Sequence, residues 1–301
     1  MKYIVLILFL MLGLSAKTIT PNDSYAQSML IQEHMHFLLK HYGVKHDHKG
    51  ILKKNTFSTK LRPRNIWQKS YEILVKINIL RTLNNLSRIE PVGMEPVEQL
   101  NPDVVYGQTQ RVLTEIKIFE VRMFIEVPDF KLKSYTHKNM LDVYNSFSQI
   151  SAAFDELNRF ELSPSYIFAE TMRIYDDLTI ILAHLNIKDE TIPTVRLEKT
   201  KHTDSIVVSM KILEKLQKLQ RSVGIKIIDF RAFKKDSSSS DVYTITGMII
   251  AEIQPIKAYI GLISSVTPPA LSYSKKVPAD IEQLMGWNLR KLLLIKTLDR
   301  R

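Results

Sequence analysis

The chain has no cysteine and little glycine, and these two shortages exclude several classes of site. None of its 301 residues is Cys, which rules out thiol nucleophiles, iron–sulfur clusters, c-type haem attachment and Cys-based zinc sites. It has nine glycines, about 3% of the chain, against a usual share near 7%. Phosphate-binding loops and strained nucleophile turns are built from glycine, so the residues for such motifs are largely missing.

The sequence also lacks a membrane-spanning hydrophobic run, although it begins with a short apolar one. Lys2 precedes an apolar stretch from Tyr3 to Leu14, and Ser15-Ala16 offers small residues for cleavage. This order is typical of a secretory signal peptide, and the stretch is shorter than the ~20 residues of a transmembrane helix. We predict a signal peptide over 1–16 and a periplasmic mature chain that begins at Lys17. An uncleaved N-terminal anchor is the alternative.

The remaining composition is that of a folded, basic protein. Hydrophobic residues make up 45% of the chain, which is enough to form a core without disulfides. Lys and Arg total 42 against 31 Asp and Glu, so removal of Lys2 with the signal peptide leaves a net charge of +10.

Seven segments share one pattern of apolar residues. Each opens with Pro, Ser, Met or His and continues with apolar residues every three or four positions, the period of an amphipathic helix. Proline is tolerated in a first turn, and nearby Ser and Asp supply capping oxygens. An eighth helix is predicted from Ser24 to Tyr42. The seven predicted starts lie near residues 63, 102, 140, 164, 202, 239 and 278.

These spacings predict an all-α fold of antiparallel helical hairpins, arranged as a bundle or a short α-solenoid. The connection at Leu162-Ser163 is nearly absent, which favours a tight hairpin between the third and fourth helices. The other linkers have about fourteen residues and could instead run back along a helix, so bundle and solenoid both stay open. We divide the chain into the signal peptide 1–16, an N-terminal helix and linker 17–62, and a helical repeat domain 63–301.

A charged residue recurs at the fourteenth position in six of the seven segments, with alternating sign, and the segment that starts near 140 has Ala153 there. Antiparallel neighbours would bring opposite charges together, so we predict a pair between Lys76 and Glu115. A coincidence among solvated charges is the alternative. The acidic members are Glu115, Asp177 and Glu252, and the basic ones are Lys76, Lys215 and Lys291.

The positive charge is concentrated in the six long linkers, whose net charges together equal the +10 of the mature chain. Lysines recur just before the next helix, and clustered lysines attract anions. An anionic surface or a protein is therefore the expected partner, while nucleic acid is not expected in the periplasm. The alternative is that these side chains only keep the chain soluble. The candidate residues are Lys131, Lys133, Lys199, Lys201, Lys234, Lys235, Lys275 and Lys276.

Two further patterns concern metal binding and catalysis. Histidines cluster near the N-terminus, and His34, His41, His46 and His48 are the weak candidates for a metal site. They lack the four-residue helical spacing and the intervening Glu of metalloprotease motifs. A Ser-x-x-Lys string begins at Ser272, but that motif works only on a helical turn, and this one follows two prolines in a linker.

No arrangement of residues in the sequence supports catalysis, and no cofactor is predicted. We expect an exported, non-catalytic binding or scaffold protein for an anionic or protein partner. The alternative is a periplasmic carrier or sensor of a small molecule or metal ion. Its site would lie between helices or at the histidine cluster.

Overall fold

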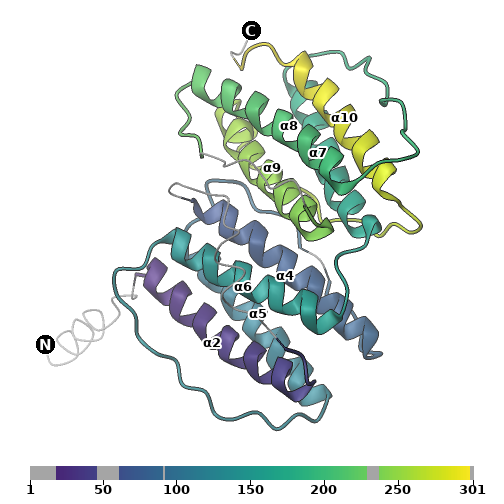
Figure 1. Ribbon diagram of the computed structural model, residues 1–301. Coiled ribbons are helices and arrows are strands. Elements are labelled where there is room, and N and C mark those ends of the chain that lie inside the picture. The colour runs from purple at the N-terminus through teal and green to yellow at the C-terminus, as the bar shows by residue number, and fades with distance from the viewer. Residues whose placement is uncertain (1–17, 46–60, 91, 229–236, 299–301) are drawn as a thin grey trace, which may run out of the picture.

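The computed structural model describes residues 18–45, 61–90, 92–228 and 237–298, which form eight α-helices (Figure 1). The all-α fold class is confirmed, and the seven predicted repeat starts coincide with observed helix starts. The predicted signal peptide, residues 1–16, lies outside the described residues. The helices are α2 (Pro21–His41), α4 (Pro63–Leu83), α5 (Pro102–Arg122), α6 (Met140–Asn158), α7 (Pro164–His184), α8 (His202–Ser222), α9 (Ser239–Tyr259) and α10 (Pro278–Leu294).

The helices begin where the sequence supplies caps. The side chain of Asn101 accepts a hydrogen bond from the amide of Val104 at 3.0 Å at the start of α5. At the start of α6, Asn139 accepts from Leu141 at 2.8 Å, and Asp142 accepts from the Asn139 amide at 2.9 Å. Each bond satisfies an amide that has no partner within its helix.

The eight helices form two four-helix bundles with the same order of neighbours. In the first bundle α2 and α4 each contact α5 and α6, and in the second α7 and α8 each contact α9 and α10. The first two helices of each bundle, α2 with α4 and α7 with α8, therefore lie diagonally opposite each other. The N-terminal helix α2, which the sequence set apart from the repeat region, completes the first bundle.

Within each bundle the neighbouring helices run parallel, so the predicted antiparallel hairpins are not confirmed. The starts of α2 and α6 meet where the Asn22 side chain accepts from the Lys138 amide at 2.8 Å. Farther along the same two helices, Gln32 donates to Ser146 at 2.8 Å. In the second bundle Tyr243 near the start of α9 contacts Glu170 of α7. Lys257, farther along α9, contacts Asp177, which lies farther along α7, so these helices are also parallel.

The long linkers make this parallel arrangement possible. A 21-residue helix is about 31 Å long, and fourteen extended residues reach up to about 50 Å. The linker after α5 runs back along α2, where Phe130 packs on His34 and Tyr135 packs on Tyr25. The linker after α7 runs back along α10, from the Trp287–Thr191 bond to the Arg196–Asp280 ion pair.

The short connection at 159–163 leads from one bundle into the other instead of closing a hairpin. Among the described helices α6 and α7 are not in contact, and α4 with α9 is the pair whose backbones approach most closely between the two bundles. These two run antiparallel, because Arg64 at the start of α4 reaches Glu252, whereas Lys76 reaches Ser240 at the start of α9. The second bundle therefore points opposite to the first (Figure 1).

Helix α4 is central and is buried on nearly every side. One of its faces contributes Ile66, Ile73 and Ile77 to the core of the first bundle. The opposite face contributes Trp67 and Tyr71 to the core that is otherwise built mainly by the second bundle. The two cores thus share a helix, which holds the bundles together.

The recurring charge at position fourteen marks the register of the helices, but the predicted partner is wrong. Lys76 contacts Ser151 and Asp155 of α6 and not the predicted Glu115. In parallel neighbours the fourteenth residue of one helix meets the nineteenth residue of the other. The fourteenth-to-nineteenth contacts are His34–Glu120 and Arg81–Glu115 in the first bundle, and Asp177–Lys257 and Glu252–Gln220 in the second.

Candidate binding cleft between the two bundles

A cleft of about 540 Å³ lies where the two bundles meet beside α4 and α7. This volume falls within the ~300–1,000 Å³ typical of small-molecule sites. The cleft draws residues from both bundles and from two linkers. Its lining includes Tyr71, Val75 and Asn78 of α4, Arg88 to Glu90, Ser163, Ser165, Tyr166 and Ala169 at the start of α7, Tyr243 of α9, and Ala270 to Lys275.

Two buried tyrosines are fixed at the cleft by contacts on several sides. The Tyr71 ring stacks on Trp67 with 5.8 Å between centroids, and its hydroxyl accepts from the Ala270 amide at 3.1 Å. The Tyr243 hydroxyl donates to Glu170 at 3.2 Å. Burial raises the pKa of both phenols, so they stay neutral at physiological pH.

A buried ion pair lies behind these tyrosines. Arg173 donates to both oxygens of Glu170 at 2.8 and 3.0 Å, and its guanidinium lies 4.5 Å from the centre of the Tyr71 ring. Burial raises the pKa of Glu170, although the Arg173 charge opposes that shift. Arg173 also donates from Nε to the Pro268 carbonyl at 2.7 Å, which ties a linker to this pair.

Both linker walls of the cleft are anchored. Asn78 clamps the backbone of Ile89 through two hydrogen bonds of 2.9 and 2.6 Å. The other wall is held at one end by an antiparallel bridge between Met94 and Thr267, whose hydroxyl donates to Asp177 at 2.6 Å. At its other end the Lys276 amide donates to Ser165 at 3.2 Å. The cleft is therefore largely preformed.

Three exposed charged side chains lie at the edge of the cleft. Arg88 and Lys275 are cationic and Glu90 is anionic, and all three line the cavity. Within the described part of the chain none of the three forms a salt bridge. Their charges are therefore available to a bound molecule.

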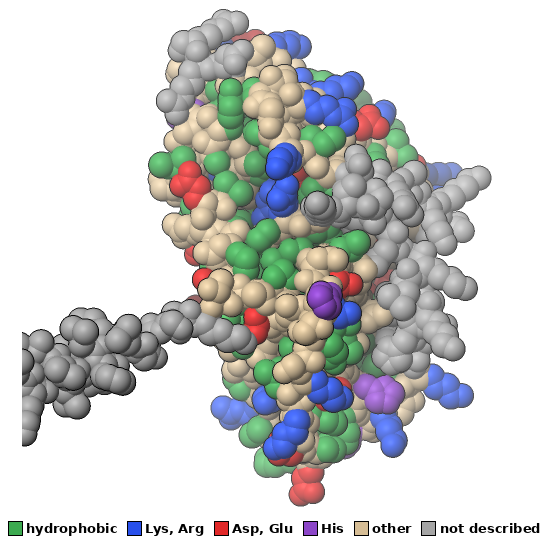
Figure 2. Space-filling model, turned by 90° about the vertical axis from the view of Figure 1, so that its left-hand side faces the viewer, with side chains coloured by type: hydrophobic (Ala, Val, Ile, Leu, Met, Phe, Trp, Pro, Cys, Tyr) green, Lys and Arg blue, Asp and Glu red, His purple; other side chains and the backbone are tan. Residues whose placement is uncertain are grey.

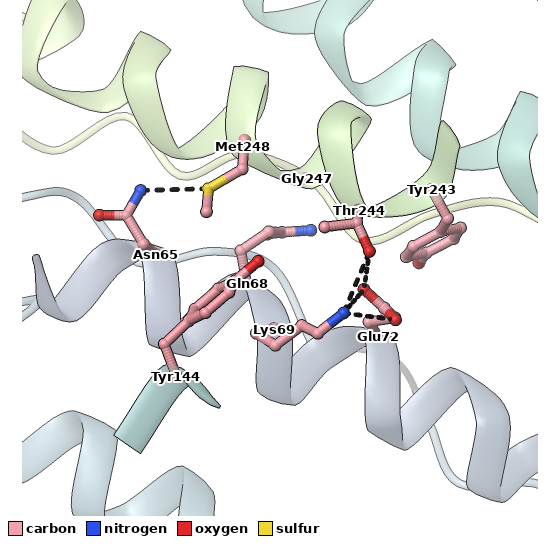
Figure 3. Close-up of a pocket in the computed structure, with 9 residues that line it drawn as sticks. All are labelled: Asn65, Gln68, Lys69, Glu72, Tyr144, Tyr243, Thr244, Gly247 and Met248. Atoms are coloured by element: carbon pink, nitrogen blue, oxygen red, sulfur yellow. Dashed lines mark hydrogen bonds and ion pairs between the residues drawn. The ribbon is translucent and has the colours of Figure 1, made fainter. Parts of the chain in front are cut away.

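A second, much smaller space lies inside the contact between α4 and α9 (Figure 3). Its volume is about 10 Å³, which is room for one water molecule at most. Lys69 donates to Glu72 at 2.8 Å and to Thr244 at 3.0 Å. Burial alone would raise the pKa of Glu72, but the charges of Lys69 and Lys76 lower it to about 2. This space belongs to a polar helix contact and is too small for a ligand.

The predicted lysines that the structure describes have different surroundings. Figure 2 shows Lys and Arg side chains scattered over both bundles on one face. Lys131 pairs with Asp129, and Lys133 pairs with Glu33 at 2.5 Å. Lys275 lies at the cleft, and Lys276 lies 4.2 Å from the centre of the Phe168 ring. Lys199 and Lys201 are exposed, whereas Lys234 and Lys235 lie outside the described residues.

Of the four candidate histidines the structure describes His34 and His41, whose surroundings differ. His34 is buried and bonded to Glu120 at 2.8 Å, whereas His41 is exposed and stacks on Phe37. His46 and His48 lie outside the described residues. Across residues 18–45, 61–90, 92–228 and 237–298, no group of three or more His, Asp or Glu side chains is placed to hold a metal ion.

Sequence reasoning identified Lys275 among the cleft residues and missed most of the others. Neither Tyr71 nor Tyr243 was among the candidate residues. The string from Ser272 to Lys275 does line the cleft, but it lies in a linker and not on a helical turn, as its prolines indicated.

No protein-family model, curated protein or solved structure matches this chain. None of the described helices has both the length and the apolar character needed to cross a membrane.

Proposed function

We propose that this chain is an exported, non-catalytic protein that binds a small polar molecule in the cleft between its two bundles. The observation that carries the proposal is the cleft itself, a preformed cavity of about 540 Å³ shared by both bundles and lined by hydroxyl groups. Its polar lining comes mainly from four tyrosines and four serines: Tyr71, Tyr166, Tyr243, Tyr273, Ser163, Ser165, Ser272 and Ser274.

The chemistry of this lining favours recognition over reaction. Phenol and hydroxyl groups donate and accept hydrogen bonds, and the aromatic faces supply apolar contact. The charged groups of the cleft are exposed at its edge, whereas the buried Glu170 is already bonded to Arg173 and Tyr243. The cations Arg88 and Lys275 outnumber the one exposed carboxylate, Glu90, and so favour a ligand that carries an anionic group. The sequence also predicted an anionic partner, and here we propose that this partner is a small molecule.

A thermal-shift screen tests this proposal. The purified protein is heated with a panel of sugars, organic acids, amino acids and nucleotides, each at high concentration. A specific ligand at 100 times its Kd should stabilise the fold by about 2.7 kcal/mol. Val75→Trp should fill the cleft and abolish the shift. Val207→Trp on α8 is the matched control, because Val207 is 55% exposed and does not line the cleft. Equal shifts in both variants would contradict the cleft as the site.

A further inference from the structure

Six helices end in the same way, and one of the six carries an unexpected residue. In each, the residue after the C-cap has a positive φ, and the next amide donates to the carbonyl five residues back, as Ile125 does to Glu120 at 2.9 Å. Glycine or asparagine is the usual residue at such a position. Five of the six fit, namely Gly43, Asn85, Asn186, Gly224 and Gly261, and the sixth is Phe124.

Phe124 is disfavoured at this position for two separate reasons. Its φ of 54° is a conformation that bulky side chains rarely adopt. Its side chain is also 93% exposed, so a large apolar surface faces water. A residue that costs stability on both counts, where five related helix ends use glycine or asparagine, points to a contact outside the chain.

The residues around Phe124 have the same character. On the preceding turns of α5, Val121 is 73% exposed and Ile118 is 38% exposed, at the three-residue spacing that places them on one side of the helix. Exposed cations flank this apolar stripe on the same helix, at Lys117 and Arg122.

The neighbouring helix adds more positive charge to the same end of the molecule. α2 lies beside α5 and runs parallel to it, so their last turns share one tip (Figure 1). Lys40 and Lys45 are exposed at the end of α2. The nearby acids in sequence are Glu126 and Asp129, and Asp129 is paired with Lys131. The tip therefore has a net positive charge around an apolar centre.

We infer that this tip docks on the surface of a lipid bilayer that contains anionic phospholipids. Three apolar side chains expose on the order of 300 Å², well below the ~800 Å² per partner of a stable protein interface. A protruding aromatic side chain surrounded by cations suits an interface where the ring enters the acyl region and the cations meet phosphates. This site is independent of the cleft.

Co-sedimentation with vesicles tests the inference on the mature chain. We expect binding to vesicles of phosphatidylethanolamine and phosphatidylglycerol, little binding to phosphatidylcholine alone, and loss of binding as salt rises. Phe124→Gly should weaken binding by about ten- to a hundred-fold, because the ring supplies most of the buried apolar area. The same substitution should raise Tm by about 2 °C, because glycine adopts a positive φ without strain.

Two further variants separate binding from stability. Asn186→Gly changes the equivalent residue of α7, so it should leave vesicle binding unchanged whatever its effect on Tm. Val121→Ser removes a second exposed apolar group and should weaken binding without changing the helix end. Phe124→Gly protein that binds anionic vesicles as tightly as the parent would overturn the inference. Equal binding of the parent to both kinds of vesicle would also overturn it, as would dimerisation that depends on Phe124 without vesicle binding.

Discussion

The ion pair between Arg64 and Glu252 joins the two bundles. Removing one partner and then both should show how much of the stability change comes from an unpaired buried charge and how much comes from lost packing. Arg64 donates to Glu252 from Nε at 3.2 Å and from Nη2 at 3.0 Å. Asn65 and Gln220 each donate to the same carboxylate at 3.1 Å. Glu252 is 1% exposed and Arg64 is 7% exposed, so solvent screens this pair very little.

Arg64→Met should lower the free energy of unfolding by about 3–5 kcal/mol, because it leaves the Glu252 carboxylate buried without its cation. The double variant Arg64→Met with Glu252→Met should recover most of that loss, since apolar side chains can replace a buried ion pair at little cost. Lys188→Met is the control, because its pair with Glu190 is 86% and 72% exposed and should contribute less than about 1 kcal/mol.

Urea unfolding measures these differences, and the two tryptophans report on the contact between the bundles and on the second bundle. Trp67 lies in α4 and Trp287 in α10, and the chain has no other tryptophan. Fluorescence should therefore follow the bundle contact and the second bundle, and circular dichroism should follow the helices of both bundles. A loss below about 1 kcal/mol for Arg64→Met, or a double variant no more stable than the single, would refute the reasoning.

Three further predictions concern the helix contact, acid stability and export. Gly247→Ala should lower the free energy of unfolding, measured in urea, by about 1–3 kcal/mol, because the new Cβ would lie 2.7 Å from Cγ of Gln68. Gly107→Ala is the control, because no described atom lies within 4 Å of its new Cβ, and it should raise the free energy of unfolding by about 0.5–1 kcal/mol. The pKa of Glu72 falls from 4.5 to about 2 on folding, so its stabilising contribution is present above pH 4.5 and is lost as pH falls through 2. The stability difference between the parent and Glu72→Gln should shrink over that range. N-terminal sequencing of the exported protein should begin at or within two residues of Lys17, and intact Met1 in the inner membrane would contradict export.

The helices themselves could be predicted from the sequence because their signals are local. Proline and capping residues mark the starts, and the apolar period marks the buried face of each helix. The charge at position fourteen also carried real information about register, since residues such as Glu115 and Asp177 lie at helix contacts.

The direction of neighbouring helices could not be predicted, because an amphipathic pattern reads the same for parallel and antiparallel packing. The short connection at Leu162 suggested a hairpin, yet α6 and α7 bury their apolar faces in different bundles. The cleft was hidden for a related reason. It depends on contacts such as Met94 with Thr267, between linkers that are remote in sequence and share no recognisable pattern.

Native mass spectrometry of the protein purified from its own cells tests the proposed binding function most directly. The account predicts a species heavier than the mature chain by the mass of one small molecule, released on denaturation and absent from the Val75→Trp variant. The Val207→Trp control should retain it. A parent protein that carries no bound molecule, or a Val75→Trp variant that carries the same one, would contradict the claim that the cleft between the bundles is a ligand site.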